Sequence, residues 1–228
     1  MSEYNVTYPF GPLIYTSDIS GEFYEFLLDG LDDCKSEDYD ARKFLVGNID
    51  EQRFAPYDPS RFTKFVDPHL MNYLIEKYKR INKVNEICNK ELVEWDHNKS
   101  KVAYHMAEGP WVNFQKHGEF NPMHNHGGTL SVVIFLKIPE EINEERRKST
   151  FSAKASGCLQ FMFFDQHILV KPKEAMMYIF PAYLWHSVYP FITDTERISM
   201  SFNFHDILID GRPVPINDTI FIGGNSQY

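Results

Sequence analysis

Residues 111–139 read WVNFQKHGEFNPMHNHGGTLSVVIFLKIP, a stretch that joins a His-x-His pair to a strand-like apolar run. His124 and His126 stand two positions apart, ahead of two glycines and the run Leu130–Ile138. Residues two apart in a strand project to the same side. If the end of a strand runs through both histidines, their imidazoles converge, and converging imidazoles suit a divalent transition metal. Taken alone the pattern is weak, because two surface histidines in a loop produce it by chance.

A second stretch, residues 175–205, predicts three short strands separated by proline turns. The strands are Met176–Phe180, Leu184–Tyr189, which carries His186, and Arg197–Phe204. An arginine among small hydroxyls suits an anion site, although an antiparallel edge with its polar face in water remains the alternative. The third strand alternates cleanly, with Arg197, Ser199, Ser201 and Asn203 on one face and Ile198, Met200, Phe202 and Phe204 on the other.

The order of these pieces resembles the iron(II)- and 2-oxoglutarate-dependent dioxygenases, whose pattern is His-x-Asp/Glu, a distal His and then Arg-x-Ser. More specifically it is similar to an oxygenase group found in bacteria and phages, over roughly Pro110–His205. The matching positions are Trp111, Asn113, Asn121, His124, His126, Leu130, Ser131, Phe135, Gly157, Leu159, Phe161, Phe180, Pro181, His186, Arg197, Ser199, Ser201, Phe202 and Asn203.

The resemblance implies an iron(II) site and a place for 2-oxoglutarate as co-substrate. His124, His126 and His186 would be the metal ligands, while Arg197, Ser199 and Asn113 would bind the co-substrate. The chain departs from the family pattern at His126, which stands where the family has a carboxylate. A site with two histidines completed by water, or by a carboxylate from elsewhere such as Asp165, therefore stays open. A smaller departure is Phe135, where some relatives have a tyrosine that bonds the co-substrate.

Many short strands after an early helical region predict a mainly β fold with flanking helices, the double-stranded β-helix or cupin-like jelly roll. We expect a single domain over residues 1–228. Residues 1–100 would form a helical and irregular part that packs on the barrel, and residues 101–222 the jelly-roll catalytic core. In the first part we expect a helix over Ser17–Leu31, a strand over Phe44–Ile49, a loop over Gln52–Phe65 and a long helix from Asp67-Pro68 to Leu92.

In the second part we expect strands over Lys101–Met106, Gly157–Phe164 and Ile168–Val170, and an edge strand over Thr219–Ile222. The charged segment Glu140–Ser156 lacks strand character. It is interpreted either as a lid or substrate contact or as a solvated insertion.

Composition limits the class of protein. The apolar content of 43% predicts a globular chain. A net charge of −9 without a basic run disfavours a duplex nucleic-acid surface. No apolar stretch is long enough to span a bilayer, and the first residues lack a signal pattern. Three widely spaced cysteines, Cys34, Cys88 and Cys158, are expected to be reduced thiols in a cytoplasmic protein.

Three functional hypotheses follow. The first is a dioxygenase that hydroxylates a substrate, small molecule or side chain, which the sequence does not name. The second is a jelly-roll binding or structural protein without turnover, supported by His126 in the carboxylate position. The third is a cupin-type metalloenzyme with three histidines that does not use 2-oxoglutarate. The remaining histidines are expected to be structural or exposed, and His69 and His97 in particular to be exposed. No membrane partner is expected, and the oligomeric state stays open.

Overall fold

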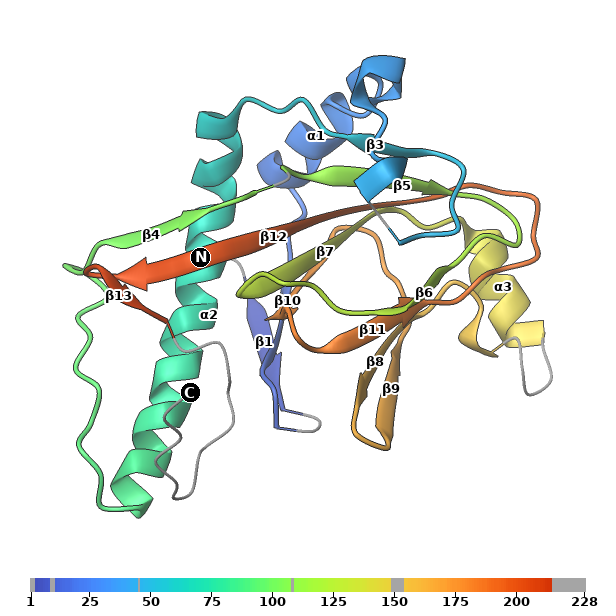
Figure 1. Ribbon diagram of the computed structural model, residues 1–228. Helices are drawn as coiled ribbons and strands as arrows, with labels where there is room; N and C mark the ends of the chain where they lie inside the picture. Colours follow the sequence, from blue (N-terminus) through green and yellow to red (C-terminus); the bar gives the residue numbers. More distant parts are fainter. Residues whose placement is uncertain (1–2, 9–10, 45, 108, 149–153, 215–228) are drawn as a thin grey trace.

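A computed structural model describes residues 3–8, 11–44, 46–107, 109–148 and 154–214, and its ribbon is drawn in Figure 1. Two antiparallel sheets make up most of it. The larger sheet contains β1 (Tyr4–Thr7), β2 (Ile14–Asp18), β3 (Gln52–Phe54), β4 (Val102–His105), β5 (Trp111–Gln115), β7 (Leu130–Lys137), β10 (Met176–Pro181), β12 (Arg197–Ile209) and β13 (Arg212–Pro213). The smaller sheet contains β6 (Asn121–His124), β8 (Leu159–Phe163), β9 (Gln166–Val170) and β11 (Trp185–Val188).

The strand order identifies the fold. The larger sheet runs β1-β2-β10-β7-β12-β5-β3, with β4 and β13 paired to β12, and the smaller sheet runs β6-β11-β8-β9. From β5 to β12 the chain passes repeatedly between the two sheets, with β8 and β9 together in the smaller one, as in a jelly roll. The double-stranded β-helix with flanking helices that the sequence predicts is confirmed.

In the described part of the chain three α-helices accompany the sheets: α1 (Glu22–Asp29), α2 (Pro59–Ile87) and α3 (Glu140–Lys148). Short 3-10 turns, η1 (Asp33–Lys35), η2 (Glu37–Tyr39) and η3 (Arg42–Phe44), follow α1. Helices α1 and α2 lie along one face of the larger sheet, and α3 lies at the opposite end of the barrel from β4 and β13 (Figure 1). The helical coverage is thus concentrated on the larger sheet.

Side-chain alternation divides the interior into two apolar clusters. Along β12 the even positions, such as Met200 and Phe202, join the cluster between the larger sheet and the helices. Along β7 and β8 Phe135 and Phe161 join a second cluster inside the barrel. The odd positions of β12 point into the barrel instead, which confirms the polar and apolar faces that the sequence predicts for this strand.

The first hundred residues contain more β-structure than the sequence indicates. The predicted helix over Ser17–Leu31 is wrong at its start, because Ile14–Asp18 pairs with both β1 and β10 before α1 begins at Glu22. The predicted strand over Phe44–Ile49 is wrong. The third strand of the chain is instead Gln52–Phe54, which pairs with β5 inside the stretch expected to be a loop.

The long helix begins nine residues earlier than the sequence predicts, at Pro59 and not at Asp67-Pro68, and ends at Ile87. Asp58 caps it, since its carboxylate accepts a hydrogen bond from the Arg61 backbone N–H at 2.8 Å. Pro68 lies inside the helix, although an interior proline removes a backbone hydrogen bond. Buried Val66 and Leu70 on either side of it pack into the main cluster, and this packing offsets the loss.

Other expectations have simpler outcomes. Residues 140–148 of the charged segment form α3, and the predicted edge strand Thr219–Ile222 lies outside the described residues. His69, expected to be exposed, is buried: its Nδ1 lies 2.9 Å from the Tyr15 hydroxyl. Cys34 and Cys158 are buried free thiols and Cys88 is an exposed one.

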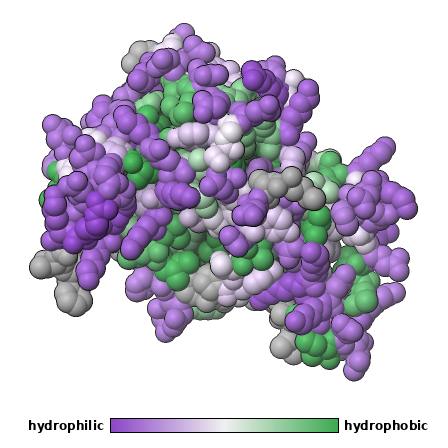
Figure 2. Space-filling model, turned by 180° about the vertical axis from the view of Figure 1, so that it is seen from behind, coloured by the Kyte–Doolittle hydropathy of each residue, from purple (hydrophilic) through white to green (hydrophobic). Residues whose placement is uncertain are grey.

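The surface seen from behind is mainly hydrophilic, with separate hydrophobic areas between the polar ones (Figure 2). Among the described helices none combines the length and the apolar character that a membrane crossing needs.

Candidate metal centre

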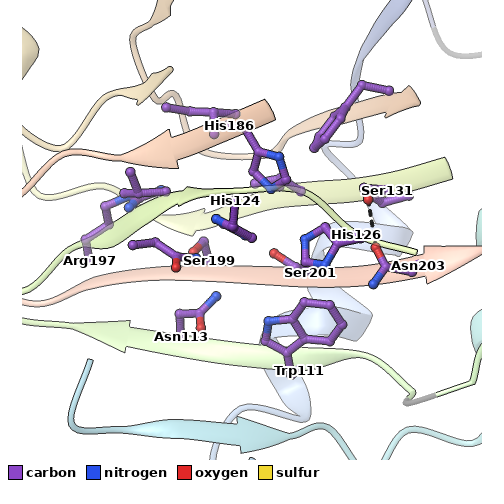
Figure 3. A pocket seen from close by; sticks show the side chains of 16 residues that line it. Trp111, Asn113, His124, His126, Ser131, His186, Arg197, Ser199, Ser201 and Asn203 are labelled. Atoms are coloured by element: carbon purple, nitrogen blue, oxygen red, sulfur yellow. Dashed lines mark hydrogen bonds between the residues drawn. The ribbon is translucent and has the colours of Figure 1, made fainter. Parts of the chain in front are cut away.

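Three histidines from one end of the smaller sheet meet at a point. His186 on β11 lies directly across from His124 on β6 in the antiparallel register, so both side chains share a face of the sheet. Their ring centroids are 4.2 Å apart, and His126 lies 4.9 Å from His124 and 5.2 Å from His186. One ring nitrogen from each residue lies within 4.8 Å of the other two. Figure 3 shows the three rings turned toward one another.

Hydrogen bonds to backbone carbonyls fix the orientation of two of these rings. The Nδ1 of His124 lies 2.7 Å from the Pro122 carbonyl oxygen, and the Nδ1 of His186 lies 2.9 Å from the Leu184 carbonyl oxygen. A carbonyl only accepts, so each Nδ1 carries the proton and each Nε2 keeps a free lone pair. Such a bond on the far ring nitrogen is the usual support of a metal-binding histidine.

The loop after β6 holds His126 in place. Its backbone N–H donates to the Ala182 carbonyl at 2.8 Å, and the N–H of Thr129 donates to the Phe204 carbonyl at 2.7 Å. Gly128 allows this close approach, because a Cβ there would lie 2.8 Å from the Phe204 carbonyl oxygen. The glycine turn therefore presses the loop against β12 and directs His126 toward the other two rings.

Burial keeps the three imidazoles neutral. It lowers the pKa of His126 to about 4 and lowers the pKa of His124. Burial and the neighbouring imidazoles hold the pKa of His186 well below its ordinary value. A neutral imidazole is the form that binds a metal, so the cluster needs no deprotonation at neutral pH. Within the described residues no carboxylate joins the cluster, and Asp165 is exposed in the turn between β8 and β9.

Arg197, the first residue of β12, is the second notable feature of this end of the barrel. It is 1% exposed, and its Nη1 donates to the Gln115 side-chain oxygen at 2.5 Å. Its Nε and Nη2 are buried without a hydrogen-bond partner. Burial lowers its pKa to about 10, which still leaves the guanidinium charged at neutral pH. No Asp or Glu in the described part of the chain pairs with it.

The residues around Arg197 complete a site for a planar anion. The guanidinium carbon lies 5.0 Å from the centre of the Phe135 ring. Ser199, on the same face of β12, is buried and directly opposite Asn113 of β5. The Asn113 side-chain oxygen accepts a hydrogen bond from Gln52 at 2.7 Å, which leaves its amino group for the cavity. A buried cation with two free donors and a serine beside it fits a carboxylate.

One narrow cavity of about 30 Å³ connects the two features. The odd residues of β12 line this cavity, and Ser199 and Ser201 follow Arg197 along the strand beside the histidine cluster (Figure 3). A wider cavity of about 320 Å³ adjoins it on the His126 side.

All six site residues named from the sequence lie around this narrow cavity: His124, His126, His186, Arg197, Ser199 and Asn113. Sequence reasoning missed Gln52 and Gln115, which orient Asn113 and Arg197 through their side chains. Neither stands in a recognisable pattern. Gln115 precedes the motif on the same strand face as Trp111 and Asn113, so alternation alone identifies it as a candidate, whereas the sequence predicts a loop at Gln52.

A family comparison agrees with this geometry. Residues 109–203 match the family described as "Putative 2OG-Fe(II) oxygenase". Over these residues the chain is similar to that oxygenase family. The resemblance stated from the sequence is thereby confirmed. The matched residues extend from just before β5 into the first half of β12. The family implies iron(II) and 2-oxoglutarate, and it supports a dioxygenase function without naming a substrate.

Several solved structures are similar to this chain at low identity. An oxidoreductase of the 2OG-Fe(II) oxygenase family from Burkholderia pseudomallei is 13% identical, with 88% of this chain and 73% of that chain covered and a TM-score of 0.39. A prolyl hydroxylase from Trichoplax adhaerens, in complex with a hypoxia inducible factor peptide, is 12% identical, with 90% and 84% covered and a TM-score of 0.48. AviO1 from Streptomyces viridochromogenes is 10% identical, with 90% of each chain covered and a TM-score of 0.44. A comparison with proteins of curated function found no match. The fold assignment rests on the strand order given above.

Proposed function

We propose that this protein is an iron(II)- and 2-oxoglutarate-dependent dioxygenase that hydroxylates its substrate. His124, His126 and His186 would hold the iron, with His126 in the position that the family gives to a carboxylate. Arg197 and Ser199 would hold the far carboxylate of 2-oxoglutarate, and Asn113 would donate to it or to a water on the metal. The observation that carries the proposal is the unpaired charge of Arg197 beside a cluster of three neutral histidines.

Burial of an unpaired cation is costly, so this charge is difficult to explain structurally. A hydrophobic side chain would fill the position at lower cost. A dianionic ligand that reaches from the histidines to Arg197 would satisfy the free guanidinium donors and remove the cost. The jelly-roll binding protein without turnover has no need for such an anion site, and neither has the cupin-type enzyme that does not use 2-oxoglutarate.

Iron(II) and 2-oxoglutarate, when bound, supply the oxidising power, since their joint reaction with dioxygen releases succinate and carbon dioxide and inserts oxygen into the substrate. The chain's own residues would bind and orient the iron and the 2-oxoglutarate and would exclude water. Three neutral ligands in place of two histidines and a carboxylate leave the metal one charge more positive, which strengthens its attraction for a dianion. The narrow cavity joins the histidines to Arg197, so a ligand held there would contact both.

The test is an anaerobic titration of the metal-free protein, first with iron(II) and then with 2-oxoglutarate, followed by visible absorption. We expect a weak charge-transfer band of the iron chelate that saturates with 2-oxoglutarate. Arg197→Met should require much more 2-oxoglutarate for the same band, while Arg212→Met, an exposed arginine on β13, should not. Iron binding without any response to 2-oxoglutarate would favour the cupin-type enzyme, and no iron binding would favour the binding protein.

A cytoplasmic location also remains a proposal, supported by the free thiols of Cys34, Cys88 and Cys158.

A further inference from the structure

The wider cavity beside the histidine cluster is continuous with the proposed metal site. Trp111, His124 and His126 line both cavities, and Gln52 and His205 belong to the wider one. Its volume of about 320 Å³ admits a group of several heavy atoms. A molecule seated there lies directly against the imidazoles of His124 and His126.

The lining of this cavity carries no strong charge. It consists of the asparagine and glutamine side chains, histidines, Trp111, Val46 and a glycine, and no Asp, Glu, Lys or Arg lines it within the described residues. A carboxylate or ammonium group would lose its hydration here without gaining an opposite charge. The cavity therefore favours an uncharged group, in contrast to the cationic end of the narrow cavity at Arg197.

Three residues of this lining each have a buried side-chain polar atom without a hydrogen-bond partner. The atoms are the side-chain oxygens of Gln52 and Asn121 and the Nε2 of His205. Gln52 is held by its own amino group, which donates to Asn113 at 2.7 Å, so its oxygen stays fixed. Carboxamide oxygens only accept hydrogen bonds. Buried acceptors of this kind are costly unless a ligand supplies N–H or O–H donors.

Trp111 adds a flat apolar wall. Its side chain is buried, its ring centroid lies 6.1 Å from that of His126, and the indole lies beside Asn203 in the view of Figure 3. A planar polar group can pack against the indole face while its edge bonds the amide oxygens. A primary carboxamide meets each requirement, since it is uncharged and planar and carries two N–H donors.

We infer that the wider cavity binds an uncharged carboxamide group of the substrate, through Gln52, Asn121 and His205, with Trp111 as the packing surface. The identification of the bound group as part of the oxidised substrate rests on the proposed function. The binding itself does not, because the cavity is formed by the chain alone.

The test uses the tryptophan indole N–H signals of the ¹⁵N-labelled, metal-free full chain. The chain has three tryptophans, so three signals are expected, and Trp111→Phe assigns one of them. Trp95, near Tyr78 and His97, and Trp185, half exposed on the smaller sheet, lie away from the cavity and serve as references. The probes are propionamide and two charged molecules of the same size, propionate and propylammonium.

We expect propionamide to shift the Trp111 signal in a saturable manner and to leave the two reference signals in place. The two charged probes should bind at least about tenfold more weakly, a difference of about 1.4 kcal/mol. Equal or tighter binding of a charged probe would overturn the inference. So would a shift that does not saturate, or one that is shared by all three indoles.

A pair of leucine substitutions sharpens the test. Asn121→Leu removes one of the free acceptors from β6 and should weaken propionamide binding about tenfold or more. Asn98→Leu, at an exposed position outside the cavity lining, is the matched control and should leave binding unchanged. Equal binding by both variants would contradict the role of Asn121. Because the protein is metal-free, saturable propionamide binding together with a missing iron band would overturn the proposed function and leave the inferred carboxamide site standing.

Discussion

The two sheets of the barrel differ in how they are covered, and the two halves of the proposed site divide between them. The larger sheet packs its outer face against α1 and α2 in one large aromatic cluster, and it supplies Arg197, Ser199 and Asn113. The smaller sheet supplies His124 and His186, and it leaves Trp185 48% exposed. The buried charge therefore lies on the sheet with apolar packing behind it, whereas the two histidines proposed as metal ligands, His124 and His186, lie on the less covered one. A substitution in the histidine half should therefore impair metal binding alone, and one in the Arg197 half should impair binding of the far carboxylate alone.

The largest expected effect is at the metal half. His186→Ala should lower iron affinity by more than about 100-fold, since even residues that only support a metal ligand contribute 10- to 100-fold. His167→Ala, an exposed histidine on β9, should bind iron normally. Dialysis against iron(II) followed by metal analysis measures this, and circular dichroism checks the fold. Unchanged iron content in a folded His186→Ala protein would remove His186 from the ligand set.

The next largest effect is on the packing of the larger sheet. Phe62 of α2 is buried and contacts Phe202 of β12 edge to face, with ring centroids 5.2 Å apart. Phe62→Ala should lower the free energy of unfolding by about 3–5 kcal/mol. Trp185→Ala, on the exposed face of the smaller sheet, should lower it by less than about 1 kcal/mol, although the residue lost is larger. Urea unfolding measures both, and similar losses would mean that the two sheets are equally supported.

These examples show which parts of the fold the sequence predicts well. Along β12 strict alternation separates Arg197 and Ser199 from Met200 and Phe202, because one face meets the helices and the other the cavity. The three histidines follow in the same way from local spacing and family pattern. Such positions are predictable because a single strand period fixes them.

The N-terminal third is harder to predict, because pairing and packing there override local signals. An Asp-Pro pair occurs twice, at Asp58 and at Asp67, and either one suits a helix start. Packing of Phe62 and Val66 selects the first. Strand β3 has three residues and no readable period, so its partner β5 and the role of Gln52 emerge only from the folded chain. The burial of His69 likewise depends on the distant Tyr15.

The stability of the protein should also depend on pH because of His69, which lies in α2 on the helix-covered side of the larger sheet. Burial lowers the pKa of His69 to about 4, from an ordinary value of 6.5, so the unfolded chain takes up this proton first as the pH falls. The folded state therefore loses stability as the pH falls from about 6.5 to about 4, by up to about 3 kcal/mol.

His69→Gln has no such proton to bind and should lose correspondingly less stability over this pH range. Thermal unfolding at several pH values compares it with the parent protein and with His97→Gln, whose histidine is exposed. An acid loss of the same size in His69→Gln would show that other groups cause it.

The smallest expected effect concerns the cost of the unpaired charge. Arg197→Met keeps much of the side-chain volume and removes a buried cation that has two unsatisfied donors. Without ligand, it should raise the free energy of unfolding by about 1 kcal/mol or more. Urea unfolding at neutral pH measures this, with Arg212→Met as the exposed control. A clear loss of stability would mean that Arg197 serves the fold and not a ligand.

The central claim is that one ligand joins the two sheets, with one end at the histidines and the other at Arg197. Calorimetric titration of the anaerobic iron(II) protein with 2-oxoglutarate and with 2-oxobutyrate, which lacks the far carboxylate, tests it directly. Loss of a buried, hydrogen-bonded charge pair costs about 2–5 kcal/mol, so 2-oxoglutarate should bind roughly 30-fold tighter or more. Arg197→Met should abolish this preference and leave 2-oxobutyrate binding nearly unchanged. A preference that persists in Arg197→Met, or its absence from the parent protein, would contradict the claim.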